Sequence, residues 1–164
     1  MKNNFDITCE ITEHQLRDSQ IYFTSDETSL LAADVFIVTV PTPIDHSNAP
    51  DLTALRSASK TVGRSLRERS KSNVSSDVLP IVIYESTVYP GATEEVCAVI
   101  LENESGMTYK SLSQSNSFAI GYSPERINPG DKVHTLSSIT KVVSGSHPKV
   151  TNWISDFYSS FIDA

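Results

Sequence analysis

Two short, continuous apolar runs constrain the fold of this chain more than any other feature of its sequence. The runs "ADVFIVTV" (33–40) and "VLPIVIYES" (78–86) are rich in β-branched residues and do not alternate with polar ones. This pattern is typical of strands that are buried on both faces of a sheet. Pro80 is expected near the start of the second strand, because proline cannot donate a hydrogen bond to a sheet ladder.

Amphipathic helical patterns separate and follow these runs. The segment 51–66 begins at Asp51, a predicted N-cap, and places apolar or small residues at three- and four-residue spacing, namely Leu52, Leu55, Ser59, Val62 and Leu66. A second helix is predicted over 91–103. A third is predicted to begin at Pro148, with one apolar stripe formed by Val150, Trp153, Ile154, Phe157 and Phe161.

Two further strands are predicted, one within 115–126 and one over 139–145. Strands that alternate with helices through short connections favour an α/β fold with a doubly wound, Rossmann-like parallel sheet. In such sheets ligands bind beyond the carboxyl ends of the strands, where the connecting loops converge.

Three of the predicted strands end in loops of unusual composition: "PTPID" after Val40, "ESTVYPG" after Tyr84, and "YSPERINPGD" after Gly121. Taken singly, these loops are explained by a rigid proline turn, a hydroxyl cap and a turn with a surface ion pair. Because they follow corresponding strand ends, Thr42, Thr87 and Glu125 are expected at one edge of the sheet. The three loops together predict a single site.

Composition excludes several other classes of protein. A chain of 164 residues with 38% hydrophobic residues is typical of one globular domain, and its net charge of −7 argues against nucleic acid as a partner. Cys9 and Cys97 lie far apart and match neither a metal site nor a disulfide framework, which favours a reducing cytoplasm. For the same reason no metal is expected. No apolar stretch reaches membrane-spanning length, so no membrane is expected either.

Four segments, in this order, resemble the nucleotide-sugar 6-dehydrogenase family, the UDP-glucose/GDP-mannose dehydrogenases. They are "VFIVTVPTPID", "PDLTAL", "IVIYESTVYPGATEEV" and "GYSPERINPGDKVH", and the similarity covers nearly the whole chain. The sequence of the last two segments is most similar to that of the branch that acts on UDP-N-acetylhexosamines in the synthesis of capsule, O-antigen and Vi polysaccharides.

The resemblance implies a reaction and a set of site residues. The family oxidises C6 of a UDP-sugar substrate to a carboxylate in two NAD-dependent hydride transfers, and its members are homo-oligomers. By resemblance, Thr87 is catalytic and contacts the nicotinamide with Ser86, while Glu125 serves as acid and base, and Arg126 helps to bind the sugar. The residues expected against the NAD adenosine and pyrophosphate are Val40, Pro41, Thr42 and Pro43. Glu85 occupies a variable position and is expected to be solvated and not catalytic.

The sequence also departs from the family pattern. None of its six glycines forms a G-x-G turn, and neither cysteine lies in the context of the family nucleophile; Cys97 is expected to be inert packing in a helix. Residues 1–164 are therefore expected to be a partial NAD-binding domain that lacks the first βαβ unit and the dimerisation and UDP-binding domains, and that is inactive alone. Two alternatives remain open: a noncatalytic remnant or complementing fragment that binds another polypeptide, and an unrelated Rossmann-like ligand-binding module.

Overall fold

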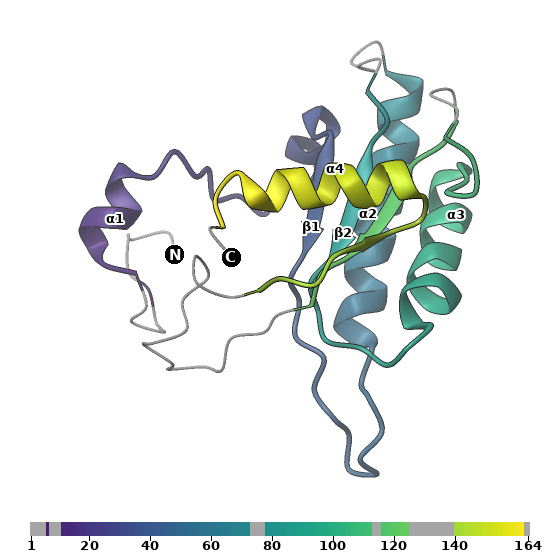
Figure 1. The fold of residues 1–164 in the computed structure, drawn as a ribbon, viewed down its shortest axis with the longest axis horizontal. Helices are drawn as coiled ribbons and strands as arrows, with labels where there is room; N and C mark the ends of the chain where they lie inside the picture. The colour runs from purple at the N-terminus through teal and green to yellow at the C-terminus, as the bar shows by residue number, and fades with distance from the viewer. Residues whose placement is uncertain (1–5, 7–10, 73–77, 113–115, 125–139, 163–164) are drawn as a thin grey trace.

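The structure is a computed structural model and describes residues 6, 11–72, 78–112, 116–124 and 140–162 (Figure 1). Strands and helices alternate through most of this part of the chain, as predicted. The elements are α1 (Glu13–Asp18), η1 (Glu27–Ala32), β1 (Val35–Val38), α2 (Thr53–Lys71), β2 (Ile81–Tyr84), η2 (Thr93–Ala98), α3 (Val99–Ser105), β3 (Ala119–Tyr122), β4 (Ser144–Gly145) and α4 (Pro148–Ser159).

The four strands form one sheet in the order β1-β2-β3-β4. β1, β2 and β3 are parallel, with Val35 opposite Ile81 and Ile81 opposite Ala119. The prediction of an all-parallel sheet is wrong for β4, which is antiparallel to β3. Residue patterns report burial, whereas strand direction depends on whether the connection carries the chain back to the end of the sheet at which the preceding strand began.

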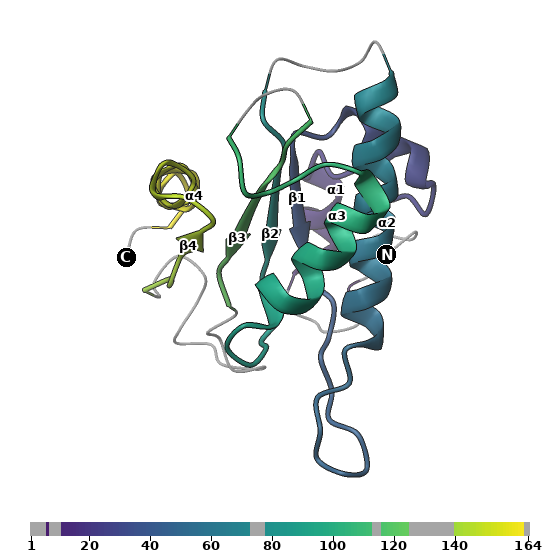
Figure 2. The same cartoon turned by 90° about the vertical axis from the view of Figure 1, so that its right-hand side faces the viewer.

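Helices cover both faces of the sheet, as the continuous apolar runs predicted. Figure 2 shows α2 and α3 on one side of the sheet and α4 on the other. The side chains of β2 alternate between these layers: Val82 and Tyr84 pack with α2 and α3, and Ile81 and Ile83 pack with α4. All four are buried, so β2 is the centre of both halves of the core.

The predicted apolar face of α2 is confirmed, because all five residues of the pattern are buried. The helix begins at Thr53 rather than Asp51. Leu52 occupies the N-cap position and makes no side-chain cap bond. Asp51 still serves the helix, since its Oδ1 accepts a hydrogen bond from the Thr53 N–H at 2.9 Å. Hydrogen bonding from the Thr53 side chain, together with this N–H bond, holds the pKa of Asp51 below its usual value.

The predicted stripe of α4 is wrong in part. Pro148 opens the helix, and Val150 and Ile154 are buried, as predicted. Trp153 and Phe161 are instead 40% and 46% exposed, and Tyr158 is buried in their place. The buried stripe therefore follows four-residue spacing from Val150, and the aromatic rings of Trp153 and Phe157 stack outside it with centroids 5.5 Å apart.

The close contact between β4 and the start of α4 requires glycine at position 145. A methyl group there would lie 2.7 Å from the backbone nitrogen of Thr151 and 2.9 Å from Cγ1 of Val150. Gly145→Ala is therefore expected to lower the free energy of unfolding by about 1–3 kcal/mol, the cost of overpacking. Urea denaturation should show this loss, while Ser144→Ala at the neighbouring exposed position stays within about 0.5 kcal/mol of the native chain. Equal values for the two variants would contradict the contact.

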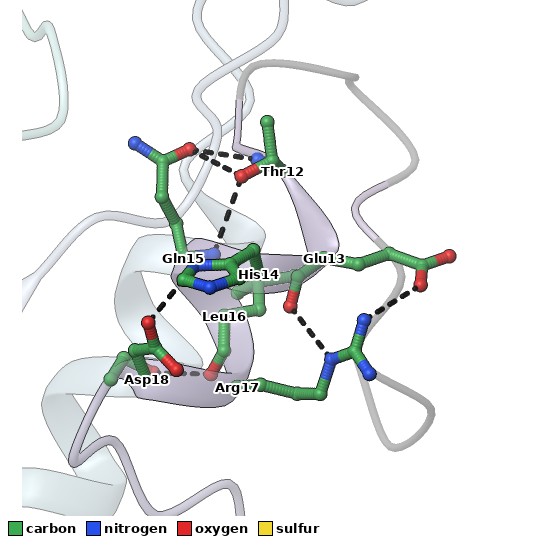
Figure 3. Close-up of polar contacts among 8 residues, drawn as sticks. Thr12, Glu13, His14, Gln15, Leu16, Arg17 and Asp18 are labelled. Carbon is green, nitrogen blue, oxygen red and sulfur yellow. Dashed lines mark hydrogen bonds and ion pairs between the residues drawn. The ribbon is translucent and has the colours of Figure 1, made fainter.

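The short helix α1 is held by its own polar side chains, as Figure 3 shows. Thr12 accepts a hydrogen bond from the Gln15 N–H, and the Gln15 side-chain oxygen accepts one from the Thr12 N–H. This reciprocal pair is a capping box. His14 contacts Asp18 and Arg17 contacts Glu13 one turn apart on the exposed surface. Among the described residues, no helix is both long enough and apolar enough to cross a membrane.

The helix after Gly91 begins as the π-helical turn η2 and continues as α3, ending at Gly106 in the left-handed conformation. Cys97 lies in η2, where it is fully buried as a free thiol, and burial raises its pKa. The expectation that Cys97 is a buried residue within a helix is confirmed.

A thiol in this position should be unreactive until the chain unfolds, because the thiolate is the reactive form. In a Cys9→Ser variant, a water-soluble disulfide reagent at neutral pH should leave the native chain unmodified and should label one thiol in denaturant. Rapid labelling of the folded variant would show that η2 opens readily and would contradict this packing.

Candidate functional site

The loops that follow β1 and β2 line a cavity beside the sheet. It measures about 290 Å³ and is lined by Thr39, Val40, Pro41, Thr42, Glu85, Ser86 and Thr87. These residues follow two neighbouring parallel strands, so the cavity lies at the carboxyl ends of the strands. This is where ligands of doubly wound sheets bind.

Two side-chain hydroxyls join the two loops. Thr42 Oγ1 donates to the Thr87 carbonyl oxygen at 2.6 Å, and Ser86 Oγ donates to the Val40 carbonyl oxygen at 2.5 Å. Ser86 is buried, whereas Thr87 is exposed. The prediction that Thr42 and Thr87 lie at one edge of the sheet is confirmed. Each hydroxyl still has lone pairs with which it can accept a hydrogen bond from a ligand.

The expectation that Glu85 is a solvated loop residue is wrong. Its side chain is only 16% exposed, and Lys141 Nζ lies 3.2 Å from its Oε1. The hydroxyl of Tyr158, on α4, donates a hydrogen bond to the same oxygen. A carboxylate at this depth is stable because it has both a cation and a donor.

Sequence reasoning missed Lys141 and Tyr158 because they are distant in the chain from the loop that they contact. One signal could have found the arrangement of Glu85. Side chains alternate along a strand, so Glu85 continues the face of Ile81 and Ile83, which is the face that α4 covers. A carboxylate on that face needs a partner from α4 or from the segment before it.

The remaining predicted site residues fall into two groups. Pro43 does not line the cavity; its carbonyl oxygen accepts a hydrogen bond from the Asp51 N–H at 2.7 Å, closing the base of the loop that projects beyond the sheet in Figure 1. Glu125 and Arg126 lie outside the described residues. Their predicted roles, and those of Thr87 and Ser86 toward a ligand, stay predictions.

A second, wider hollow of about 430 Å³ lies beside the projecting loop, between Asp45, Arg56 and Tyr89. It is an open groove on the surface, and none of the residues that line it lines the cavity. In the part of the chain that the structure describes, no three histidine, cysteine or carboxylate side chains come together as metal ligands would.

A largely parallel sheet, covered by helices on both faces and hollowed at the carboxyl ends of adjacent strands, defines a Rossmann-like domain. The chain belongs to the UDP-glucose/GDP-mannose dehydrogenase family. The profile of that family's NAD binding domain matches residues 7–162.

Relatives and solved structures agree with this assignment. The chain is 49% identical to protein CapL of Staphylococcus aureus over its whole length, covering 35% of that protein. It is 44% identical to the UDP-N-acetyl-D-glucosamine 6-dehydrogenase of Salmonella typhi, again covering all of this chain and 35% of the relative. The chain thus spans about a third of the length of the curated relatives that it matches.

Two solved structures share the fold. A UDP-D-ManNAc dehydrogenase from Pyrococcus horikoshii matches with a TM-score of 0.66 and 31% identity, covering 85% of this chain and 29% of that one. A GDP-mannose dehydrogenase from Pseudomonas aeruginosa matches with a TM-score of 0.77 and 22% identity, covering 93% of this chain and 33% of that one. At this identity the match shows a shared fold.

Proposed function

We propose that this chain is the later part of the NAD-binding domain of a nucleotide-sugar 6-dehydrogenase that oxidises C6 of a UDP-N-acetylhexosamine. One observation carries the proposal. The loops "VPTP" and "EST", through which the sequence resembles the family, meet at the carboxyl ends of β1 and β2 and enclose a cavity between them. The high identity to UDP-N-acetyl-D-glucosamine 6-dehydrogenases supports the choice of substrate class.

The cavity fits part of NAD. Its volume of about 290 Å³ is at the lower end for a small-molecule site, so it takes only the part of NAD that lies where the two loops meet and not the whole dinucleotide. Thr42, Ser86 and Thr87 offer hydroxyls to ribose or carboxamide groups. The sequence has no G-x-G turn to hold the pyrophosphate, so these loops supply adenosine and nicotinamide contacts without a phosphate cradle.

NAD supplies the hydride acceptor when it is bound, and the protein residues position the reacting groups. In the proposed assignment Val40, Pro41, Thr42 and Pro43 pack against the cofactor. Ser86 and Thr87 orient its nicotinamide end, and Thr87 also polarises the oxygen on C6. Glu125 serves as acid and base, and Arg126 helps to orient the sugar; the family resemblance alone supports these last two roles.

The proposal also covers the biosynthetic process, the cellular compartment, the oligomeric state and the domain assignment. Surface polysaccharide synthesis is supported by the similarity to CapL, and a reducing cytoplasm is supported by Cys97, which is a free thiol. A homo-oligomer is expected from the family alone. Residues 1–164 are assigned to one partial domain, because the family profile covers 7–162 as a single unit.

A second candidate, a complementing fragment that pairs with another polypeptide, is favoured by the edge strand. Among the described strands, β1 pairs only with β2, and Ile37 on β1 is 42% exposed. An unpaired strand edge is a template for another strand. Co-purification with a polypeptide that carries a G-x-G turn would support this candidate, and an unaccompanied, monodisperse chain would oppose it.

The expected affinity for NAD is weak, because the sequence has no glycine-rich turn whose amide groups would hold the pyrophosphate. A dissociation constant of about 1 mM corresponds to about 4 kcal/mol. Titration of the purified chain, followed by ligand-observed NMR, should therefore saturate in the millimolar range. A 1 mM addition should stabilise the chain by less than about 1 kcal/mol in a thermal melt.

Two results would contradict the proposal. Absence of saturable binding at concentrations well above millimolar would remove NAD as the ligand of these loops. A large rise in melting temperature with 1 mM NAD would indicate a phosphate site that the account omits. NADP at the same concentrations is the matched control for nonspecific binding of a dinucleotide.

A further inference from the structure

Glu85, Lys141 and Tyr158 form a buried polar cluster directly behind the cavity. Glu85 lines the cavity, and its carboxylate contacts the other two side chains on the side of the sheet covered by α4. The Lys141 side chain is 3% exposed. These three residues come from the end of β2, the segment before β4, and α4.

The cluster is held by charge as well as by a hydrogen bond. The ammonium group of Lys141 contacts Glu85 as an ion pair without hydrogen-bond alignment, and it also lies 4.8 Å from the centre of the Tyr158 ring. A cation over an aromatic face is attracted by the ring, most strongly when water is excluded. Tyr158 therefore holds both partners, the carboxylate through its hydroxyl and the ammonium through its ring.

The cluster lies next to the loop that follows β2 and can fix the position of that loop. Glu85 immediately precedes Ser86 and Thr87, whose contacts with Val40 and Thr42 fix the loop from the side of β1. The Glu85 side chain fixes the same stretch of main chain from the opposite side. The last ladder bond, from the Glu85 N–H to the Val38 carbonyl oxygen at 2.9 Å, lies between these two sets of contacts.

We propose that Glu85, Lys141 and Tyr158 are positioning residues that hold the Ser86–Thr87 segment in the geometry that binds cofactor. The proposal deepens the proposed function and rests on it for the identity of the ligand. It extends the site beyond the two loops, because a change in β4 or α4 reaches the cavity through Glu85. The cluster touches the back of the cavity and takes no part in the chemistry.

The mildest test removes only the hydroxyl of Tyr158. Tyr158→Phe is expected to raise the dissociation constant for NAD about fivefold, the scale of one hydrogen bond. Tyr84→Phe is the matched control: it also removes a buried hydroxyl, which lies 2.8 Å from Ser59 Oγ on the opposite face of β2. NAD affinity in Tyr84→Phe should stay within about twofold of the native value, because neither Tyr84 nor Ser59 lines the cavity.

A second pair of variants removes a buried cation. Lys141→Met should weaken NAD binding more than Tyr158→Phe does, because it leaves Glu85 unpaired beside the cavity. Arg69→Met is its control, since Arg69 is buried and pairs with Asp34, which precedes β1 and so lies at the opposite end of the strands from the cavity. Circular dichroism identifies the variants that fold. If Lys141→Met or Arg69→Met does not fold, the tyrosine pair still tests the proposal.

Amide hydrogen exchange gives a readout that does not need the ligand. In the positioning variants the Glu85 amide should lose protection relative to the amides inside β2, whereas the controls should leave this ratio unchanged. If the native chain binds no NAD but the exchange result holds, the proposed function fails and the positioning cluster stands. If exchange and affinity change equally in the variants and their controls, the cluster is only structural and the proposal is overturned.

Discussion

Phe118→Ala is expected to lower the free energy of unfolding by about 3–5 kcal/mol, the range for truncating a buried aromatic side chain. Phe118 precedes β3 and is fully buried in the core formed with α2 and α3. Its ring lies 6.4 Å from that of Tyr109, centroid to centroid. Truncation removes this contact and leaves a cavity between the sheet and α3 that the surrounding helices cannot fill.

Phe161→Ala is the matched control for this loss. Phe161 follows α4 and is nearly half exposed, so its truncation should cost about 1 kcal/mol or less. Urea denaturation of both variants gives the comparison directly. Similar losses for the two would show that the layer between the sheet and α3 is not closely packed in the isolated chain, in contradiction to the fold.

Lys141→Met is expected to lower the free energy of unfolding by about 3 kcal/mol, because removing one partner of a buried ion pair leaves the other uncompensated. Glu85 is the charge that remains, and among the described residues the Tyr158 hydroxyl is then the side-chain donor that contacts it. Urea denaturation at neutral pH measures this loss.

The control for Lys141 is Lys71→Met on the surface of α2. Lys71 pairs with Glu68 one turn away, and both side chains are more than half exposed. Exposed pairs contribute about 0–1 kcal/mol, so this variant should unfold close to the native chain. A loss as small for Lys141 as for Lys71 would show that water reaches the Glu85 carboxylate, in conflict with its burial.

Local patterns were sufficient to predict the layers of the fold. The buried strands, the face of α2 and the convergence of the loops after β1 and β2 all follow from burial, which the sequence encodes residue by residue. The direction of β4 could not be predicted in this way. The buried face of α4 was also ambiguous, because apolar residues lie on both sides of that helix and tertiary contacts select Tyr158 over Trp153.

In the site, too, features set by local sequence could be predicted and features set by tertiary contacts could not. The hydroxyls of Thr42 and Ser86 lie at the predicted strand ends, because strand ends are determined by local pattern. The partners of Glu85 could not be inferred from its own surroundings in the sequence, since Tyr158 lies 73 residues further along the chain. Long-range pairing of polar groups depends on how helices and strands pack. The sequence around a single carboxylate does not indicate which residue pairs with it.

The most direct test of the account is to locate NAD on the folded chain. In an amide chemical-shift titration, the account predicts that the saturable shifts concentrate on 39–42 and 85–87. They should be weaker or absent in the groove between Asp45, Arg56 and Tyr89, which is the wider hollow on the surface. Saturable shifts confined to that groove, with none at the ends of β1 and β2, would contradict the assignment of the cofactor site.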